Sequence, residues 1–259
     1  NWGTQPGVSG KNPLTDHYKG AMSYPVPRID FDQVEVDIKA IRDDAKNNGE
    51  GDYYDTSPSG SKGYHVVLKT DSYDLYKVTK YSSSDLNITQ ESLLGNHLYP
   101  EDGIIILEDN TWINGTINGQ KITIIAADPE QSGNNQKRIV IPDLIKYTNF
   151  DGSDKIGLIT QTDILVAKTA PHNMEIDAAM IAKDGEIKIK SYSGLHKGNI
   201  RVYGSMAHNT GLVWTYSYGG GSWSGYATTE TIIDQFNVLN PPPKFPLTGT
   251  YAILSWREE

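Results

Sequence analysis

The chain has 259 residues and a net charge of −9 at pH 7, with 21% charged and 37% hydrophobic residues. This composition predicts a folded, water-soluble protein with a substantial core. The acidic balance argues against nucleic acid and anionic lipid as partners, because both attract clustered Lys and Arg. The sequence contains no cysteine, which excludes disulfides, thiolate metal sites and cysteine nucleophiles.

No apolar run approaches the roughly 20 residues that span a bilayer, and no signal peptide is recognisable. We therefore expect no membrane insertion by this chain. If the protein is exported, we expect its leader or membrane anchor to lie outside the sequence given.

One convincing helix is predicted after an extended, Pro- and Gly-rich segment over residues 1–28. Apolar residues at spacings of three and four form a single stripe: Phe31, Val34, Ile38, Ile41 and Ala45. Asp32 with Glu35 resembles a capping box, and Asn48-Gly49 supplies a left-handed stop. The helix is expected to cover one end or side of a β-structure.

A β-hairpin is predicted next, after a polar loop over 52–62. Alternating apolar residues in two runs, 64–68 and 73–77, flank the turn Thr70-Asp71. Residues 82–102 are mostly polar and are expected to be a connection. Together, residues 29–101 are predicted to form a small helix-plus-hairpin region ahead of the main β domain.

The residue pattern of the sequence changes at Gly103, after which short apolar runs alternate with polar turns. Ile104–Leu107, Thr111–Ile113 and Lys121–Ala126 are such runs. Two Asn-Gly pairs, Asn114-Gly115 and Asn118-Gly119, lie too close together to flank a hairpin strand. They are interpreted as corners of a coiled sheet.

A quasi-repeat supports that interpretation. Three segments, 125–128, 181–184 and 206–209, share an apolar–Ala–x–Asp/Asn pattern, and 159–162 is a degenerate fourth member. Thr160 precedes Ala182 by 22 residues and Ala182 precedes Ala207 by 25, which is about one turn of a solenoid. The predicted fold is mainly β, an irregular right-handed parallel β-helix over 102–259, with an aromatic and Gly-rich loop at 214–227 and a Pro-rich segment at 241–259.

An aromatic-rich stretch is the first candidate binding surface. It contains Trp214, Tyr216, Tyr218, Trp223 and Tyr226. Exposed aromatic rings among glycines stack on sugars or on a partner protein. The alternative, an ordinary hairpin whose aromatics face inward, remains open.

Oxygen-rich turns and carboxylate pairs are the other candidates. Asp151 and Asp154 flank a compact turn that could hold Ca²⁺ or form an Asx turn, and no other cofactor is indicated. Carboxylate pairs of the kind that glycosidases use are Asp151/Asp154, Glu175/Asp177 and Asp128/Glu130. The six histidines lack metal-binding helical spacing. We interpret most of these acidic residues as corner formers or as parts of solvated faces, and we predict a protein that is not an enzyme.

Several segments together carry a resemblance to a known family. They are Pro27–Asp32, Gly63–Leu68, Asp74–Val78, Asp102-Gly103, Trp112–Thr116, Gly157–Ile164, Glu175–Ala182, Tyr203–Ser205 and the closing Pro241–Pro246, Tyr251 and Ser255–Glu258. The chain resembles the minor-pilin-like, type IV pilus assembly accessory proteins of bacteria, most strongly after residue 100.

This resemblance implies export, display at the cell surface and a structural or adhesive role, with a β-solenoid of poorly defined function. Other pilus or surface proteins are the implied partners, and surface glycans are a further one. It supplies no catalytic residues. Such proteins usually begin with a hydrophobic pilin-type helix, which this sequence does not contain. The alternative function is a carbohydrate-active or carbohydrate-binding β-helix protein.

Overall fold

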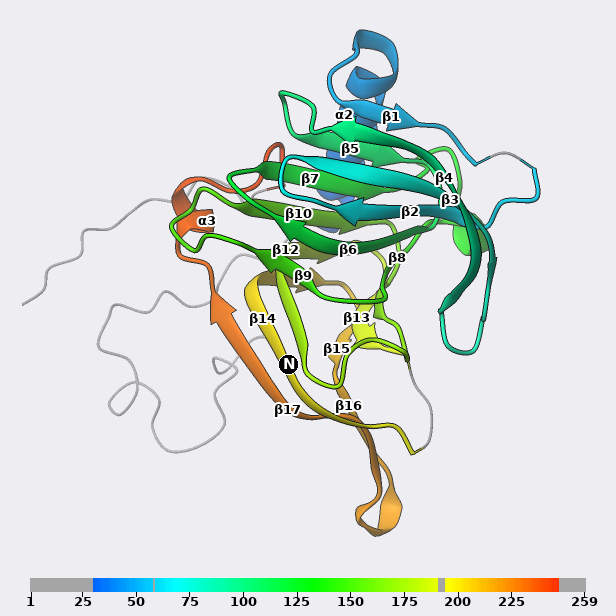
Figure 1. Ribbon diagram of the computed structural model, residues 1–259, viewed down its shortest axis with the longest axis vertical. Helices are drawn as coiled ribbons and strands as arrows, with labels where there is room; N and C mark the ends of the chain where they lie inside the picture. Colours follow the sequence, from blue (N-terminus) through cyan, green and yellow to red (C-terminus); the bar gives the residue numbers. More distant parts are fainter. Residues whose placement is uncertain (1–29, 58, 191–193, 247–259) are drawn as a thin grey trace, which may run out of the picture. The chain divides into compact units, whose positions relative to one another are not determined.

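A parallel β-sheet dominates the computed structural model, which describes residues 30–57, 59–190 and 194–246 (Figure 1). Its strands join into one 17-stranded sheet that is mainly parallel and does not close on itself. Among the described strands, only the pairs β2–β3, β3–β4 and β16–β17 are antiparallel. The expectation of a mainly β protein with parallel strands is confirmed.

Two parallel ladders make up most of the sheet. The first contains β1 (Asp52–Tyr54), β5 (Ile104–Leu107), β7 (Lys121–Ala126), β10 (Lys155–Thr160), β12 (Met174–Ala182), β14 (His196–His208) and β17 (Trp223–Ile233). The second contains β2 (Gly63–Leu68), β6 (Thr111–Ile117), β8 (Ile139–Ile141), β11 (Ile164–Val166), β13 (Glu186–Ile189) and β15 (Gly211–Val213). The short β9 (Ile145–Tyr147) pairs with both β6 and β12.

Apolar side chains at matching positions of successive strands form the core. Ile105, Ile124, Leu158 and Met180 follow one another in register and are all inaccessible to solvent. Each contributes about 1.5–3 kcal/mol on burial. The runs of Ile and Val that marked strands in the sequence are therefore the residues that fill the space between the ladders.

The alignment of the quasi-repeat matches the observed pairing between strands for three of its four members. Ala126 pairs with Thr160, and Thr160 pairs with Ala182. The fourth alignment is wrong by one residue, because Ala182 pairs with His208 rather than Ala207. A further member was missed in the sequence: Leu107 pairs with Ala126, one strand earlier.

The helix α2 (Phe31–Asn48) forms as predicted and buries Val34, Ile38, Ile41 and Ala45. Gly49 has φ +72°, consistent with the predicted stop. The helix begins at Phe31, so Asp32 lies inside its first turn and not at the N-cap. The predicted capping box of Asp32 with Glu35 is therefore wrong.

Ion pairs attach α2 to the corners that follow successive strands. Glu35 bonds Lys183 after β12, and Lys39 approaches Glu130 after β7 at 3.0 Å. Arg42, which is buried, lies 2.7 Å from Glu130 and 3.4 Å from Glu108, the residue after β5. The helix thus lies along the side of the first ladder, as expected from its single apolar stripe.

The predicted hairpin is confirmed, with Leu68 opposite Tyr73 and Val66 opposite Leu75 in β2 and β3 (Ser72–Tyr81). The predicted connection over 82–102 is wrong, because Ile88–Leu98 form β4, antiparallel to β3. Eight of the eleven β4 residues are exposed and none is buried, so backbone pairing rather than an apolar pattern defines the strand. The predicted loop over 52–62 likewise contains β1.

The connection between β3 and β4 covers the outer face of the second ladder. There Trp112, Val140 and Leu165 stack in register beneath Val78 and Leu86. The Trp112 indole donates a hydrogen bond of 2.8 Å to the Leu86 carbonyl. This small second core holds the ribbon of β3 and β4 against the sheet.

The Pro-rich segment runs along the surface as predicted, as far as it lies within the described residues. The Thr123 hydroxyl donates to the Pro243 carbonyl at 2.6 Å. Gly157 leaves room for Phe245, because a Cβ at position 157 would come within 2.7 Å of that ring. The predicted final strand at 251–256 lies outside the described residues.

The two Asn-Gly pairs differ in their surroundings, which allows a matched test of the close packing between strands. Gly115 has φ +123°, and a Cβ there would lie 2.2 Å from the Leu68 carbonyl oxygen. Gly119 has φ +68° with nothing within 4 Å of an added Cβ. We expect Gly119→Ala to lower the free energy of unfolding by about 1–2 kcal/mol, the cost of a left-handed alanine.

Gly115→Ala should lower it by at least about 3 kcal/mol, because the backbone of β2 must also move. Urea unfolding followed by circular dichroism measures both. Equal losses for the two variants would contradict the register of β2 and β6.

Candidate functional site

The predicted aromatic surface is not one surface. Trp214 and Tyr226 are core residues, with Tyr226 inaccessible to solvent. Tyr216 packs against the same core and its hydroxyl donates to the Ile189 carbonyl at 3.1 Å. Trp223 is partly buried and meets the His196 ring edge-on at 4.4 Å. Only Tyr218 among the five is exposed.

The antiparallel pairing of β16 (Thr215–Ser217) with β17 explains this placement. Thr215 faces Gly225 and Ser217 faces Trp223, so the loop between them projects while the flanking aromatics fold inward. The structure therefore supports the alternative interpretation, an ordinary hairpin, for Trp214 and Tyr226.

The two predicted calcium ligands face backbone donors. Asp154 is buried, and its carboxylate accepts hydrogen bonds from the N–H groups of Gly119, Gln120, Thr148 and Asn149. Asp151 accepts from the hydroxyl and N–H of Ser153, the arrangement of an Asx turn. The Ser153 hydrogen bonds lower the pKa of Asp151. Both carboxylates thus organise corners, and a calcium ion would have to displace their donors.

The carboxylate pairs also have partners. Asp128 accepts the Glu130 N–H at 3.2 Å, and Glu130 binds Arg42 of α2. Glu175 and Asp177, two residues apart on β12, both form ion pairs with Arg201 of β14. The Arg201 guanidinium lies 2.5 Å from the Glu175 carboxylate and 3.3 Å from that of Asp177. This third pair lies in a polar cluster on the outer face of the first ladder.

Aromatic rings surround Arg201 on that face. The guanidinium lies 5.6 Å from the ring centres of Phe150 and Tyr203, a cation–π distance. Those two rings meet edge to face at 4.9 Å. Phe236, at the start of the short helix α3 (Phe236–Leu239), packs against the 150–154 turn beside Gly152.

We name this group, Phe150, Arg201, Tyr203 and Phe236, the aromatic–arginine patch. Phe150 is 44% exposed and Phe236 is 36% exposed, and the adjacent Ile233 is 72% exposed. Glu175 and Asp177 of β12 hold Arg201 of β14 through ion pairs, so the patch presents apolar rings on a rigid base. Such fixed aromatic and arginine side chains are the residue types that dominate binding energy at interfaces.

Asp177 lies beneath the patch and is inaccessible to solvent. Burial raises the pKa of its carboxyl to about 6, an effect opposed by the hydrogen bond that it accepts from Tyr147 N–H at 3.0 Å. A carboxyl sealed in this way does not reach a bound substrate. Glu175 and Asp177 are therefore not a pair of accessible carboxylates of the kind that glycoside hydrolysis requires across the scissile bond.

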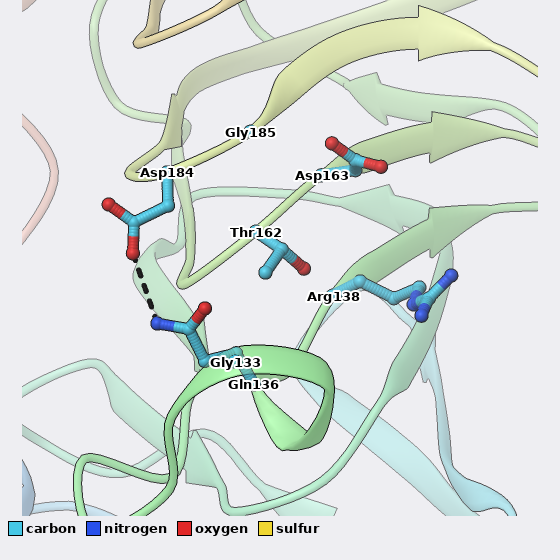
Figure 2. Close-up of a pocket in the computed structure, with 7 residues that line it drawn as sticks. All are labelled: Gly133, Gln136, Arg138, Thr162, Asp163, Asp184 and Gly185. Atoms are coloured by element: carbon cyan, nitrogen blue, oxygen red, sulfur yellow. Dashed lines mark hydrogen bonds between the residues drawn. The ribbon is translucent and has the colours of Figure 1, made fainter.

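Figure 2 shows a depression of about 410 Å³ at the corners of the second ladder. Its acidic side chains already have partners. Asp184 accepts from Gln136 at 3.0 Å, and Asp163 accepts the Glu186 N–H at 2.8 Å. Arg138 and Asp184 point to different sides of it in Figure 2. The depression therefore lacks converging groups for chemistry.

Metal and membrane features were sought over the same part of the chain. Within residues 30–57, 59–190 and 194–246, no cluster of three or more His, Asp or Glu side chains is arranged to hold a metal ion. No helix in those ranges combines the length and the apolar character that crossing a bilayer requires.

Comparisons with known proteins include a distant structural likeness. Neither a protein-family model nor a curated protein sequence matches the chain. Among solved structures, the competence-associated pilin ComZ from Thermus thermophilus aligns with 14% identity and a TM-score of 0.36. The alignment covers 73% of this chain and 38% of ComZ. The chain thus matches well under half of that protein.

Sequence reasoning paired Glu175 with Asp177 but missed Arg201, Phe150 and Phe236. A signal was available for Arg201. It lies 26 residues after Glu175, about one repeat length, and the two residues are paired in register between β12 and β14. Opposite charges one repeat apart on the outer face therefore predict an ion pair between neighbouring strands.

The buried Asp177 makes stability depend on pH. Its pKa lies near 6 in the folded protein and at 3.8 ordinarily, so the folded state binds more protons between these values. The contribution is therefore complete below pH 4 and disappears as the pH rises through 6. We expect a loss of about 2–3 kcal/mol in the free energy of unfolding over this window.

Asp177→Asn should remove that part of the pH dependence, as measured by urea unfolding at pH 4, 5, 6 and 7. Asp151→Asn is the control, since the hydrogen bonds from Ser153 lower the pKa of Asp151, so it titrates below the window. A wild-type slope in Asp177→Asn would refute the assignment.

Proposed function

We propose that this chain is a non-enzymatic structural or adhesive protein of the cell surface, associated with a pilus and acting by protein–protein assembly. The family resemblance of its sequence supports the pilus association. The acidic charge and the pattern of short strands are compatible with display outside the cell. The proposed location is extracellular, with other pilus or surface proteins as partners.

We further propose that the two parallel ladders are the faces of an irregular right-handed β-helix. In-register pairing at sequence distances of 34, 22 and 26 residues, from Ala126 to Thr160, Ala182 and His208, supports this. Each coil would pair the edges of its neighbours, which gives a stiff spacer whose ends alone expose strand edges.

The observation that carries the functional proposal is the aromatic–arginine patch. Phe150 and Phe236 expose apolar rings in this patch, and two carboxylates and two rings hold its arginine in place. A monomer gains no stability from exposing such rings, whereas a protein interface gains from burying them. We therefore assign the patch as the contact surface for a partner protein.

Binding of a surface glycan by the same patch is the second candidate. One observation favours it: aromatic rings lie beside an arginine and a carboxylate, Arg201 and Glu175, that can bind sugar hydroxyls. A glycan would bind to the ring faces without any second protein, which separates the two candidates experimentally.

Localisation in the native organism tests the proposal. We expect the protein in the surface fraction and in sheared filaments analysed by mass spectrometry. Recovery from the cytosol alone would refute it. Binding of the purified chain to a glycan array, with no protein partner in sheared filaments, would favour the second candidate.

Variants of the patch test the contact surface. We expect Phe150→Ser with Phe236→Ser to reduce association with filaments by about tenfold or more, the effect of losing one or two interface anchors. The matched control is Leu212→Ser, which changes a side chain on β15 that is 40% exposed. Equal association of both variants, measured by cosedimentation at unchanged thermal stability, would exclude the patch.

A further inference from the structure

A lysine and an aspartate are sealed together beneath the aromatic–arginine patch. Lys155, the first residue of β10, lies with its Nζ 2.8 Å from Oδ2 of Asp234, the residue that follows β17. The Lys155 side chain is fully inaccessible and that of Asp234 is 2% exposed. The other Lys–Asp and Lys–Glu pairs of the described residues each have at least one partly exposed member.

The second oxygen of Asp234 is held by two donors. Oδ1 accepts the backbone N–H of Phe236 at 3.0 Å and the hydroxyl of Tyr203 at 3.4 Å. The Phe236 ring covers the amine, with Nζ 5.5 Å from the ring centre. The Asp234 carboxyl group is therefore fixed: Oδ1 accepts hydrogen bonds from two donors, and Oδ2 lies against the Lys155 amine.

A second carboxylate lies one strand away. Gly157 pairs with Ala179 between β10 and β12, and continuing this register by two residues places Asp177 beside Lys155. Asp177 in turn pairs with Tyr203 on β14. The surroundings of the pair thus combine aromatic rings, buried carboxylates and exclusion of water.

Burying two opposite charges costs free energy, and their attraction repays this only in part. Condensation to a neutral amide would remove both charges. The same pocket supplies what such a reaction requires: a nucleophile held against the carbon, donors for the developing oxyanion, and no competing water.

We propose that Lys155 and Asp234 are joined by an intramolecular isopeptide bond. The Lys155 ammonium transfers a proton to Oδ2 of Asp234, which leaves a neutral amine and a carboxylic acid. Nζ then attacks Cγ, and the negative charge develops on Oδ1, where Phe236 N–H and the Tyr203 hydroxyl stabilise it. Nζ passes a second proton to the Oδ2 hydroxyl, the Cγ–Oδ2 bond breaks, and one water molecule leaves.

The bond would join residues 79 positions apart and would connect β10 to the end of β17. Those strands belong to the same ladder with β12 and β14 between them. Figure 1 shows α3 in orange following the end of β17. The cross-link would close the last strands of the ladder into a covalent loop and prevent them from separating.

Mass spectrometry of the purified full chain under denaturing conditions tests the proposal. We expect a mass lower than that of the sequence by one water molecule, and a branched proteolytic fragment that joins the peptides containing Lys155 and Asp234. The full sequence mass, or a loss of water located in other peptides, would overturn the proposal.

Variants of the two residues test whether Lys155 and Asp234 are the side chains that form the bond. Lys155→Arg keeps the positive charge but has no amine, so it should show the full sequence mass, a lower thermal midpoint and an unchanged circular dichroism spectrum. Asp234→Ser should also show the full mass. The control is Lys69→Arg, because Lys69 lies 2.6 Å from Asp74 but is 47% exposed, and this variant should keep the loss of water. Loss of water in Lys155→Arg would also overturn the proposal.

Discussion

In-register stacking of apolar side chains between parallel strands is the constraint on which the rest of this structure depends. Ile105, Ile124 and Leu158 occupy equivalent positions of three strands and are inaccessible because each covers the next. Side chains alternate between faces along a strand, so a slip of one residue would turn a whole set outward. Within the parallel ladders the pairing changes near Gly115, where β6 passes from pairing with β8 to pairing with β9.

The same register builds the polar clusters on the outer face. Glu175 lies beside Arg201, and Asp177 lies beside Tyr203, because β12 and β14 pair without a shift. Partners in space are thus separated by about one repeat in sequence. A rigid base of this kind fixes arginine and aromatic rings without the entropy loss that flexible loops would suffer on binding. The fold and the proposed contact surface are consequences of one alignment of strands.

The sequence predicts those elements of the fold that a local residue pattern determines. The stripe of α2, the hairpin of β2 and β3, and the short runs after Gly103 have buried faces, and a buried face is visible as periodicity. Strand β4 was missed because its side chains are exposed and only its backbone is paired. The role of Asp154 depends on donors from residues 119–120 and 148–149, which the local sequence does not reveal. The inward rotation of Trp214 and Tyr226 depends likewise on how β16 meets β17.

The last strand shows why the buried Lys155–Asp234 pair matters to the whole ladder. Among the described strands, β17 pairs beyond Gly225 with β14 alone, and Thr229 and Thr231 occupy the positions that follow Ile200 and Val202 in the core columns. Both threonines are exposed, so apolar burial contributes little at this end. Polar residues there keep the open edge soluble but leave the strand weakly held. The Lys155–Asp234 pair connects the end of β17 to β10, with β12 and β14 between them. It holds β17 in a region where few apolar side chains are buried.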